Sequence, residues 1–126
     1  MKTLSKCLFV LIFSASLATA DAVKLDGQVI RSLFAGNTAI GRLDGEKYRQ
    51  WFGEDGSMLL SKQGSETIAG EWRVDDISQE LQIILNGSDR WNGWYIMEFG
   101  QTYYWVSKTT PPTPFQILEG KKLTAD

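Results

Sequence analysis

The chain lacks histidine altogether, and its single cysteine, Cys7, lies close to the N-terminus. Without histidine there is no Ser-His-Asp triad and no imidazole ligand for a metal ion. One cysteine cannot form a disulfide within the chain, and it cannot supply the set of thiolates that a structural zinc site needs. The sequence therefore predicts no catalytic residue of these kinds, no metal ligand and no cofactor.

The sequence also lacks an apolar run long enough to cross a membrane. The longest run starts at Cys7 and is about ten residues long, whereas a transmembrane helix needs roughly 20. A basic segment with Lys2 and Lys6 precedes the run, and the small residues Ala18-Thr19-Ala20 follow it. This three-part pattern is typical of a secretory signal peptide. We expect residues 1–20 to be a signal peptide, cut near Ala20, and the protein to be periplasmic or secreted with no membrane span.

No strongly basic segment is present either. The chain has 13 Lys and Arg and 15 Asp and Glu, a formal net charge of −2. Proteins that bind nucleic acid or anionic lipid usually carry a basic face, so we expect neither partner. With no disulfide, the domain has only its core to stabilise it, and Trp, Tyr and Phe, 12% of the chain, each bury about 150–250 Å².

Residues 21–126 have about the length of one domain, and the first element predicted in them is a short helix. Asp26 suits the N-cap because its carboxylate can accept hydrogen bonds from free N–H groups of the first turn. Gly36 is a natural stop because glycine readily adopts the left-handed conformation that ends many helices. One apolar face is formed by the residues at helical spacing, Val29, Ile30, Leu33 and Phe34. A helix this short is unstable alone, so this face must pack on the rest of the domain.

Beyond Gly36 the sequence changes to short runs separated by turn signals, which is typical of an antiparallel meander. The clearest signal is Asp44-Gly45, a two-residue hairpin turn between TAIGRL and EKYRQWF. The prolines of SKTTPPTP exclude residues 107–114 from a central strand, since proline has no N–H for the ladder, and FQILEG is a candidate closing strand. We predict a mainly β domain of about seven or eight strands that forms a small antiparallel barrel or sandwich, with the helix packed on it.

These segments resemble a group of short exported proteobacterial proteins of unknown function. The resemblance rests on the helix LDGQVIRSLFAGNT, the hairpin GEKYRQWFGEDGSM, the Gly-x-Trp strand GSETIAGEWRV, a late aromatic strand and a final FQILEGKKL. It covers most of residues 21–126 and implies a periplasmic β-rich domain with no named activity. Many members of the group carry a cysteine pair, and Gln82 and Trp91 lie near the corresponding places in this chain.

The segment DRWNGWYIMEFGQTYYWV, residues 89–106, is unusually rich in aromatic residues. Strand alternation places large side chains on both faces of this hairpin, so one face can fill the core while the other needs a cover. That cover is the helix, the proline segment, a second copy of the chain in a weak homodimer, or a ligand. If the rings instead form an open platform that stacks on a sugar, the candidate ligand-binding residues are Trp91, Asn92, Trp94 and Tyr104.

Carboxylates offer the remaining chemistry. A glycoside hydrolase needs two carboxyl groups roughly 5–10 Å apart, and nothing in the sequence pairs them; most lie in or beside turns, where Asp caps backbone groups. Glu98 is the exception, because it shares a strand face with Trp94 and Ile96. We therefore expect a non-catalytic exported binding module, monomeric or weakly dimeric, for a small molecule, a glycan or an envelope protein. The alternatives are a structural or stress-related envelope protein that acts by association, and a carboxylate-based hydrolase.

Overall fold

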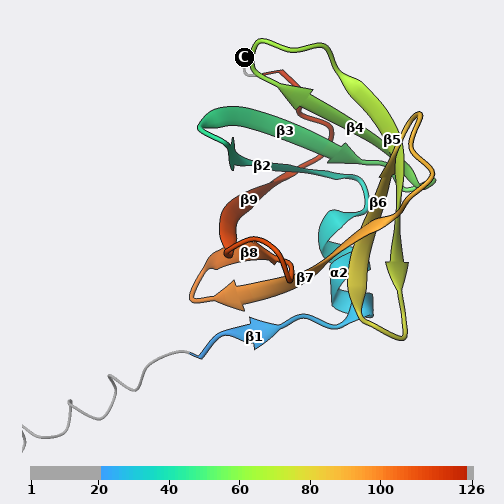
Figure 1. Cartoon of the computed structure of the whole chain (residues 1–126). Coiled ribbons are helices and arrows are strands. Elements are labelled where there is room, and N and C mark those ends of the chain that lie inside the picture. Colours follow the sequence, from blue (N-terminus) through green and yellow to red (C-terminus); the bar gives the residue numbers. More distant parts are fainter. Residues whose placement is uncertain (1–20, 125–126) are drawn as a thin grey trace, which may run out of the picture.

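The computed structural model describes residues 21–124, which form a closed β-barrel with one helix (Figure 1). The helix is α2, Gly27–Phe34. The strands are β1 Val23–Lys24, β2 Asn37–Leu43, β3 Glu46–Phe52, β4 Ser57–Lys62, β5 Ile68–Asp75, β6 Glu80–Leu85, β7 Asn92–Phe99, β8 Thr102–Val106 and β9 Thr113–Glu119. The signal peptide predicted for residues 1–20 lies outside the described residues.

Strands β2 to β9 follow one another around the barrel, and each is antiparallel to its neighbours. The ring closes because β9 returns to pair with β2, from Asn37 opposite Glu119 to Gly41 opposite Phe115. Figure 1 looks roughly along the barrel, with α2 behind the ring of strands at its far end. The predicted mainly β meander with one short helix is confirmed, and it closes as a barrel. No helix within residues 21–124 combines the length and apolarity that crossing a bilayer requires.

Strand β1 is an addition to the ring that the sequence did not predict. It pairs with β7, with Val23 opposite Glu98, on the same side of β7 that β6 occupies further along. The backbone N–H of Leu25 then donates to the carbonyl of Ile96 at 2.9 Å, which leads the chain into the helix. The two residues of β1 are exposed, so the strand is held by backbone pairing and lacks the apolar alternation by which strands are recognised in sequence.

The helix begins and ends where its sequence indicates. The carboxylate of Asp26 accepts a hydrogen bond from the backbone N–H of Val29 at 3.0 Å, and Gly36 takes the positive φ of 80° that follows the last turn. The buried face differs from the prediction, however: Ile30 and Phe34 are fully buried, whereas Val29 is 45% exposed. Gly27 takes part in the buried face instead, because the barrel approaches the first turn too closely for a side chain there, with a Val74 methyl 3.0 Å from where a Cβ would lie.

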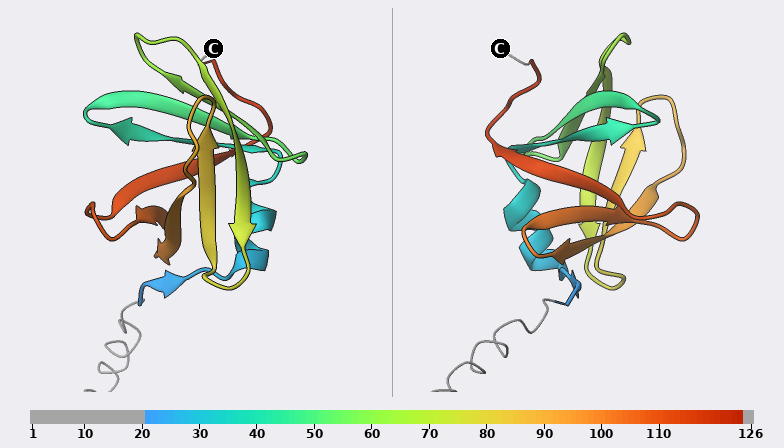
Figure 2. Two further views of the ribbon diagram at one scale, coloured as in Figure 1. Left: turned by 45° about the vertical axis from the view of Figure 1, so that its right-hand side comes forward. Right: turned by 90° about the vertical axis from the view of Figure 1, so that its left-hand side faces the viewer.

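Aromatic rings from the helix and from several strands fill the barrel. The ring of Phe34 lies 4.9 Å from that of Phe52, 5.5 Å from that of Trp105 and 5.7 Å from that of Phe115. Trp94 and Trp105 meet edge to face at 6.0 Å. Figure 2 shows that α2 stands at one end of the barrel, from which its apolar face reaches these rings.

The closing strand differs from the prediction at its start. β9 begins at Thr113 rather than at Phe115, so Pro114 is a strand residue and pairs with Tyr104 of β8. Proline is tolerated there because the β2–β9 ladder starts only at the next residue, Phe115, so Pro114 needs no N–H for it. The hairpin turn at Asp44-Gly45 is confirmed, with φ of 53° and 83° at its two residues.

Candidate functional site

The described chain has an open pocket where β2 and β9 separate. Their ladder ends at Gly41 opposite Phe115, but β2 continues to Leu43 in its hairpin with β3. The pocket has a volume of about 540 Å³, within the range of small-molecule sites. Its lining comes from β2, β3, β8 and β9: Ile40, Gly41, Arg42, Lys47, Tyr48, Arg49, Thr102, Pro114, Phe115 and Gln116. We call this the β2–β9 pocket.

Gly41 allows the tight packing beneath the pocket. A Cβ at this position would lie 3.0 Å from the hydroxyl oxygen of Tyr48 and 3.1 Å from the carbonyl oxygen of Pro114. Such distances are shorter than ordinary van der Waals contact, so an alanine here would displace the tyrosine ring or the start of β9. The glycine therefore brings the Tyr48 ring and β9 together beneath the pocket.

Three cations line the pocket, and no carboxylate is among the described residues of its lining. Arg42 and Lys47 face each other directly across the β2–β3 hairpin. Directly opposed like charges destabilise a strand pair. Neither side chain forms an ion pair with a described residue, and the Arg42 guanidinium donates only one hydrogen bond, to the carbonyl of Gly45 at 3.0 Å. The positive charge at this site is therefore not neutralised within residues 21–124.

The third cation, Arg49, has a different environment. Its Nη1 donates to the carbonyls of Lys122 at 2.8 Å and Thr124 at 3.1 Å, so its guanidinium holds the C-terminal segment against β3. The same segment is tied to β2, because the Thr38 hydroxyl donates to the Gly120 carbonyl at 2.7 Å and accepts from the N–H of Lys122 at 2.9 Å. Arg49 is thus fixed in place as one wall of the pocket.

Tyr48 connects the pocket to the barrel interior. It is only 3% exposed, and its hydroxyl oxygen accepts a hydrogen bond from Nε1 of Trp105 at 2.8 Å. Burial raises the pKa of Tyr48, against a smaller opposite effect of the Trp105 hydrogen bond, so the phenol stays protonated. This hydrogen bond ties the Tyr48 ring, which lines the base of the pocket, to the core residue Trp105.

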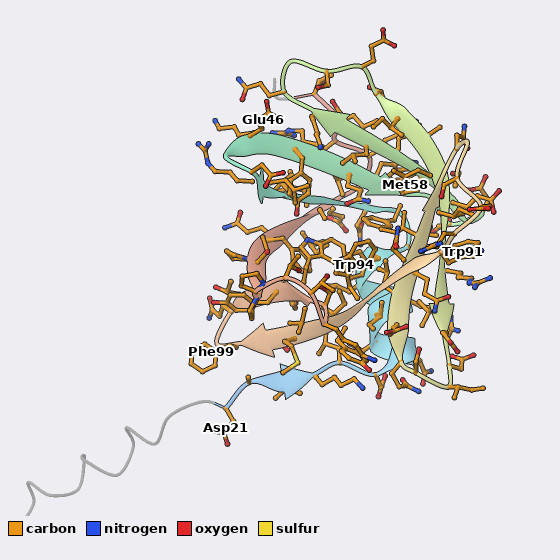
Figure 3. The ribbon with its side chains drawn as sticks, in the orientation of Figure 1. Asp21, Glu46, Met58, Trp91, Trp94 and Phe99 are labelled. Carbon is orange, nitrogen blue, oxygen red and sulfur yellow. The ribbon has the colours of Figure 1, made fainter. Side chains whose placement is uncertain are left out.

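The structure does not bring the predicted aromatic platform to one surface. Trp94 lies inside the barrel against Trp105, whereas Trp91 lies at the outside, as Figure 3 shows. The ring of Trp91 is covered by the guanidinium of Arg73, whose Cζ is 3.8 Å from the ring centroid. Asn92 is exposed at the start of β7, and Tyr104 lies half-buried opposite Met97. Ligand binding by these four residues remains a prediction.

The outer face of the β7–β8 hairpin carries the other exposed apolar group. Tyr95 is opposite Val106 and Met97 is opposite Tyr104, and Phe99 beside the turn is 49% exposed. The ammonium group of Lys24 covers one end of this surface, 4.1 Å from the centroid of the Tyr95 ring. The helix packs on the core instead, so it does not cover this face.

Two carboxylates of the turns, those of Asp55 and Asp75, cap backbone groups. The pKa of Asp55 is lowered by hydrogen bonds from the hydroxyl and the N–H of Ser57, and that of Asp75 chiefly by the N–H of Ile77. Glu98 lies between Val23 of β1 and Tyr103 of β8, with no second carboxylate placed across from it. Among residues 21–124 no cluster of carboxylates, the only available ligand type, could hold a metal ion.

A second hollow, between α2 and the β5–β6 turn, differs from the first in that its one cation, Arg31, is paired. Arg31 donates to the Asp76 carboxylate at 2.7 Å, and the side chain of Gln79 accepts from the N–H of Gly27. The Gln79 amide also donates to the Asp76 carbonyl. These contacts join the turn to the first turn of the helix, and they leave no unpaired cation in this hollow.

The residues of the β2–β9 pocket were not identified from the sequence, although part of the signal was present. A two-residue turn at Asp44-Gly45 fixes the hairpin register, and that register places Arg42 opposite Lys47. The remaining walls come from β8 and β9, about 60 residues further along the chain. Only the closure of the barrel brings them to the hairpin.

No protein-family model, curated protein or solved structure matches this chain.

Proposed function

We propose that this protein is a small exported binding module without catalytic activity, and that its ligand occupies the β2–β9 pocket. The observation that carries the proposal is the pocket itself: an open hollow of about 540 Å³ lined by apolar side chains and three cations. Pockets of this size with a few convergent polar groups are the usual form of small-molecule sites. Export rests on the signal-like segment at residues 1–20.

A non-catalytic role is supported by the chemistry that the chain offers. Histidine is absent from the whole chain, and the turn carboxylates of Asp55 and Asp75 are engaged by backbone groups. Tyr48 is a protonated donor and not a base, because its pKa is raised by burial. The pocket therefore combines groups that recognise a ligand and lacks a pair that would transform one.

A second candidate is association with another protein of the cell envelope. The observation in its favour is the outer face of the β7–β8 hairpin, where Tyr95, Met97 and Tyr104 are half-buried, Phe99 is exposed, and the described cover is the Lys24 side chain at one end. Exposed apolar patches of this kind mark interaction sites in many proteins. The ligand-binding proposal is preferred because the pocket adds charge and a hydrogen-bond donor, which give specificity.

The test is thermal unfolding in the presence of candidate ligands, with a variant in which the pocket is filled. A panel would include muropeptide and chito-oligosaccharide probes together with small organic acids. A ligand at about 100 times its Kd stabilises the folded state by about 2.7 kcal/mol, and that raises the Tm of a domain of about 100 residues by roughly 10 °C or more.

The filled variant is Ile40→Trp, and the matched control is Ile77→Trp, at a position that is 94% exposed on the β5–β6 turn. We expect at least one probe to raise the Tm of the natural protein and of the control but not of Ile40→Trp. If no probe shifts the Tm, or if Ile40→Trp responds as the control does, the β2–β9 pocket is not the binding site.

A further inference from the structure

We infer that the ligand of the β2–β9 pocket is a small organic anion, with its anionic group held between Arg42 and Lys47 and an apolar body on Ile40 and Pro114. The inference rests on the proposed function, since it names the ligand class of the same pocket. It is carried by the distribution of charge, donors and apolar surface around the point where β2 and β9 separate.

The charge distribution selects an anion. The whole chain is acidic overall, with a net charge of −2, yet the three charged residues of the pocket are all basic. The opposed pair Arg42 and Lys47 repel each other in the empty pocket, and a carboxylate or phosphate between them turns that repulsion into two attractive contacts. The site is thus better suited to an anion than to a neutral sugar.

The donors that remain free have defined places. Arg49 is engaged by the two carbonyls of the C-terminal segment, so it contributes mainly its charge. Arg42 donates one described hydrogen bond and keeps its other N–H groups, and the Lys47 ammonium group has no described partner. These two side chains are the head-group ligands, on the exposed rim formed by the hairpin.

The floor of the pocket selects an apolar body. Pro114 at the start of β9 and Ile40 of β2 provide apolar surface that is not buried. Phe115 and Tyr48 lie beneath this surface, and both side chains are buried. An inorganic anion would use the rim and leave this floor unfilled.

Three probes separate these contributions in calorimetric titrations of the protein after removal of residues 1–20. The probe 2-naphthoate has both the anionic group and the apolar body, 2-naphthalenemethanol has the body alone, and acetate has the anionic group alone. We expect 2-naphthoate to bind at least ten-fold more tightly than either partial probe, and its affinity to fall as salt is raised. Equal affinities for 2-naphthoate and 2-naphthalenemethanol would overturn the inference.

The variant that tests the residues is Arg42→Gln/Lys47→Gln, and its matched control is Arg90→Gln/Lys108→Gln, which removes the same charge outside the pocket lining. We expect the first variant to lose at least ten-fold in 2-naphthoate affinity with no loss for 2-naphthalenemethanol, and the control to bind as the natural protein does. At low salt the first variant should also unfold at an equal or higher temperature, because the opposed charges are gone. An unchanged affinity, or an equal loss in the control, would refute the assignment.

A vesicle experiment identifies the source of the anion. Vesicles of phosphatidylglycerol present the same combination of anionic head and apolar body at a lipid surface, and phosphatidylcholine vesicles are their neutral counterpart. Binding to the former that depends on Arg42 and Lys47 assigns the site to a lipid head group, and binding of 2-naphthoate without it assigns a free metabolite. If only a neutral oligosaccharide binds and Ile40→Trp blocks its binding, the proposal of a binding module is supported and the inference of an anionic ligand is refuted.

Discussion

The substitution Phe34→Ala tests whether the helix is an integral part of the barrel core. Phe34 is the last residue of α2, it is fully buried, and its ring lies within 6 Å of three other rings, those of Phe52, Trp105 and Phe115. No other residue of the helix touches so many rings of the barrel. Removing this side chain leaves a cavity at the place where the helix meets β3, β8 and β9.

The expected loss is large compared with the stability of a small domain. Truncation of a buried phenylalanine to alanine costs about 3–5 kcal/mol, and favourable aromatic pairs add about 0.5–1.5 kcal/mol each beyond the buried area. With three ring contacts, we expect the upper end of the range, about 5 kcal/mol. A domain has about 5–15 kcal/mol in total, so Phe34→Ala should remove a third or more of the stability.

Urea unfolding followed by tryptophan fluorescence and far-ultraviolet circular dichroism measures this loss. Val29→Ala is the matched control, because Val29 lies on the same helix but is 45% exposed, and its truncation should change the free energy of unfolding by less than about 0.5 kcal/mol. Phe34→Leu retains most of the side-chain volume, so its free energy of unfolding can be measured if the alanine variant does not fold. A loss below about 1 kcal/mol for Phe34→Ala, or one no larger than for Val29→Ala, would show that the helix is dispensable to the core.

Three further results follow from single contacts. Asp26→Ala removes the N-cap and should lower the free energy of unfolding by about 1 kcal/mol in urea, with no change if the helix is held by packing alone. The pKa of Asp75 is lowered below 3.8, so the stability contributed by this carboxylate is present above that pH and is lost as the pH falls through the pKa of the folded state. Asp75→Asn should flatten the fall in Tm over that pH range. A variant whose Tm falls in parallel with that of the natural protein would contradict this. The pKa of Tyr48 is raised above 10.0, so the stability contributed by the protonated phenol is present below that pH and is lost as the pH rises through the pKa of the folded state. In an ultraviolet titration of the tyrosines, Tyr48→Phe should therefore remove the last phase. Loss of an early phase would contradict the burial.

The local features of the fold were predictable because each has a local cause. The helix start at Asp26 depends on one carboxylate within three residues of its partner, and the hairpin at Asp44-Gly45 depends on two residues that tolerate positive φ. The alternation in β6 correctly places Leu81 and Ile83 in the core. In each case the residues that decide the structure are neighbours in the chain.

The features that the sequence did not reveal depend on contacts between distant segments. The strand β1 exists because β7 offers it a free edge beyond the end of β6, and Val29 is exposed because the barrel fits around Gly27 instead. Barrel and sandwich were not distinguishable, since the difference is whether β9 returns to β2. The β2–β9 pocket arises at that same closure, and for this reason its residues have no common motif.

The aromatic richness of residues 89–106 has an explanation in the closure of the barrel. A chain with no disulfide must stabilise its ring of strands through the interior, and Trp94 and Trp105 point inward to meet Phe34 and Phe115 there. An interior filled by rings has no room for a ligand, in contrast to larger barrels that bind ligands inside. A ligand of the proposed kind would therefore enter where the ladder opens, between β2 and β9, and would meet the polar groups that closure leaves at its rim. The aromatic core thus supports the pocket, because Trp105 donates a hydrogen bond to Tyr48, which lines the base of the pocket.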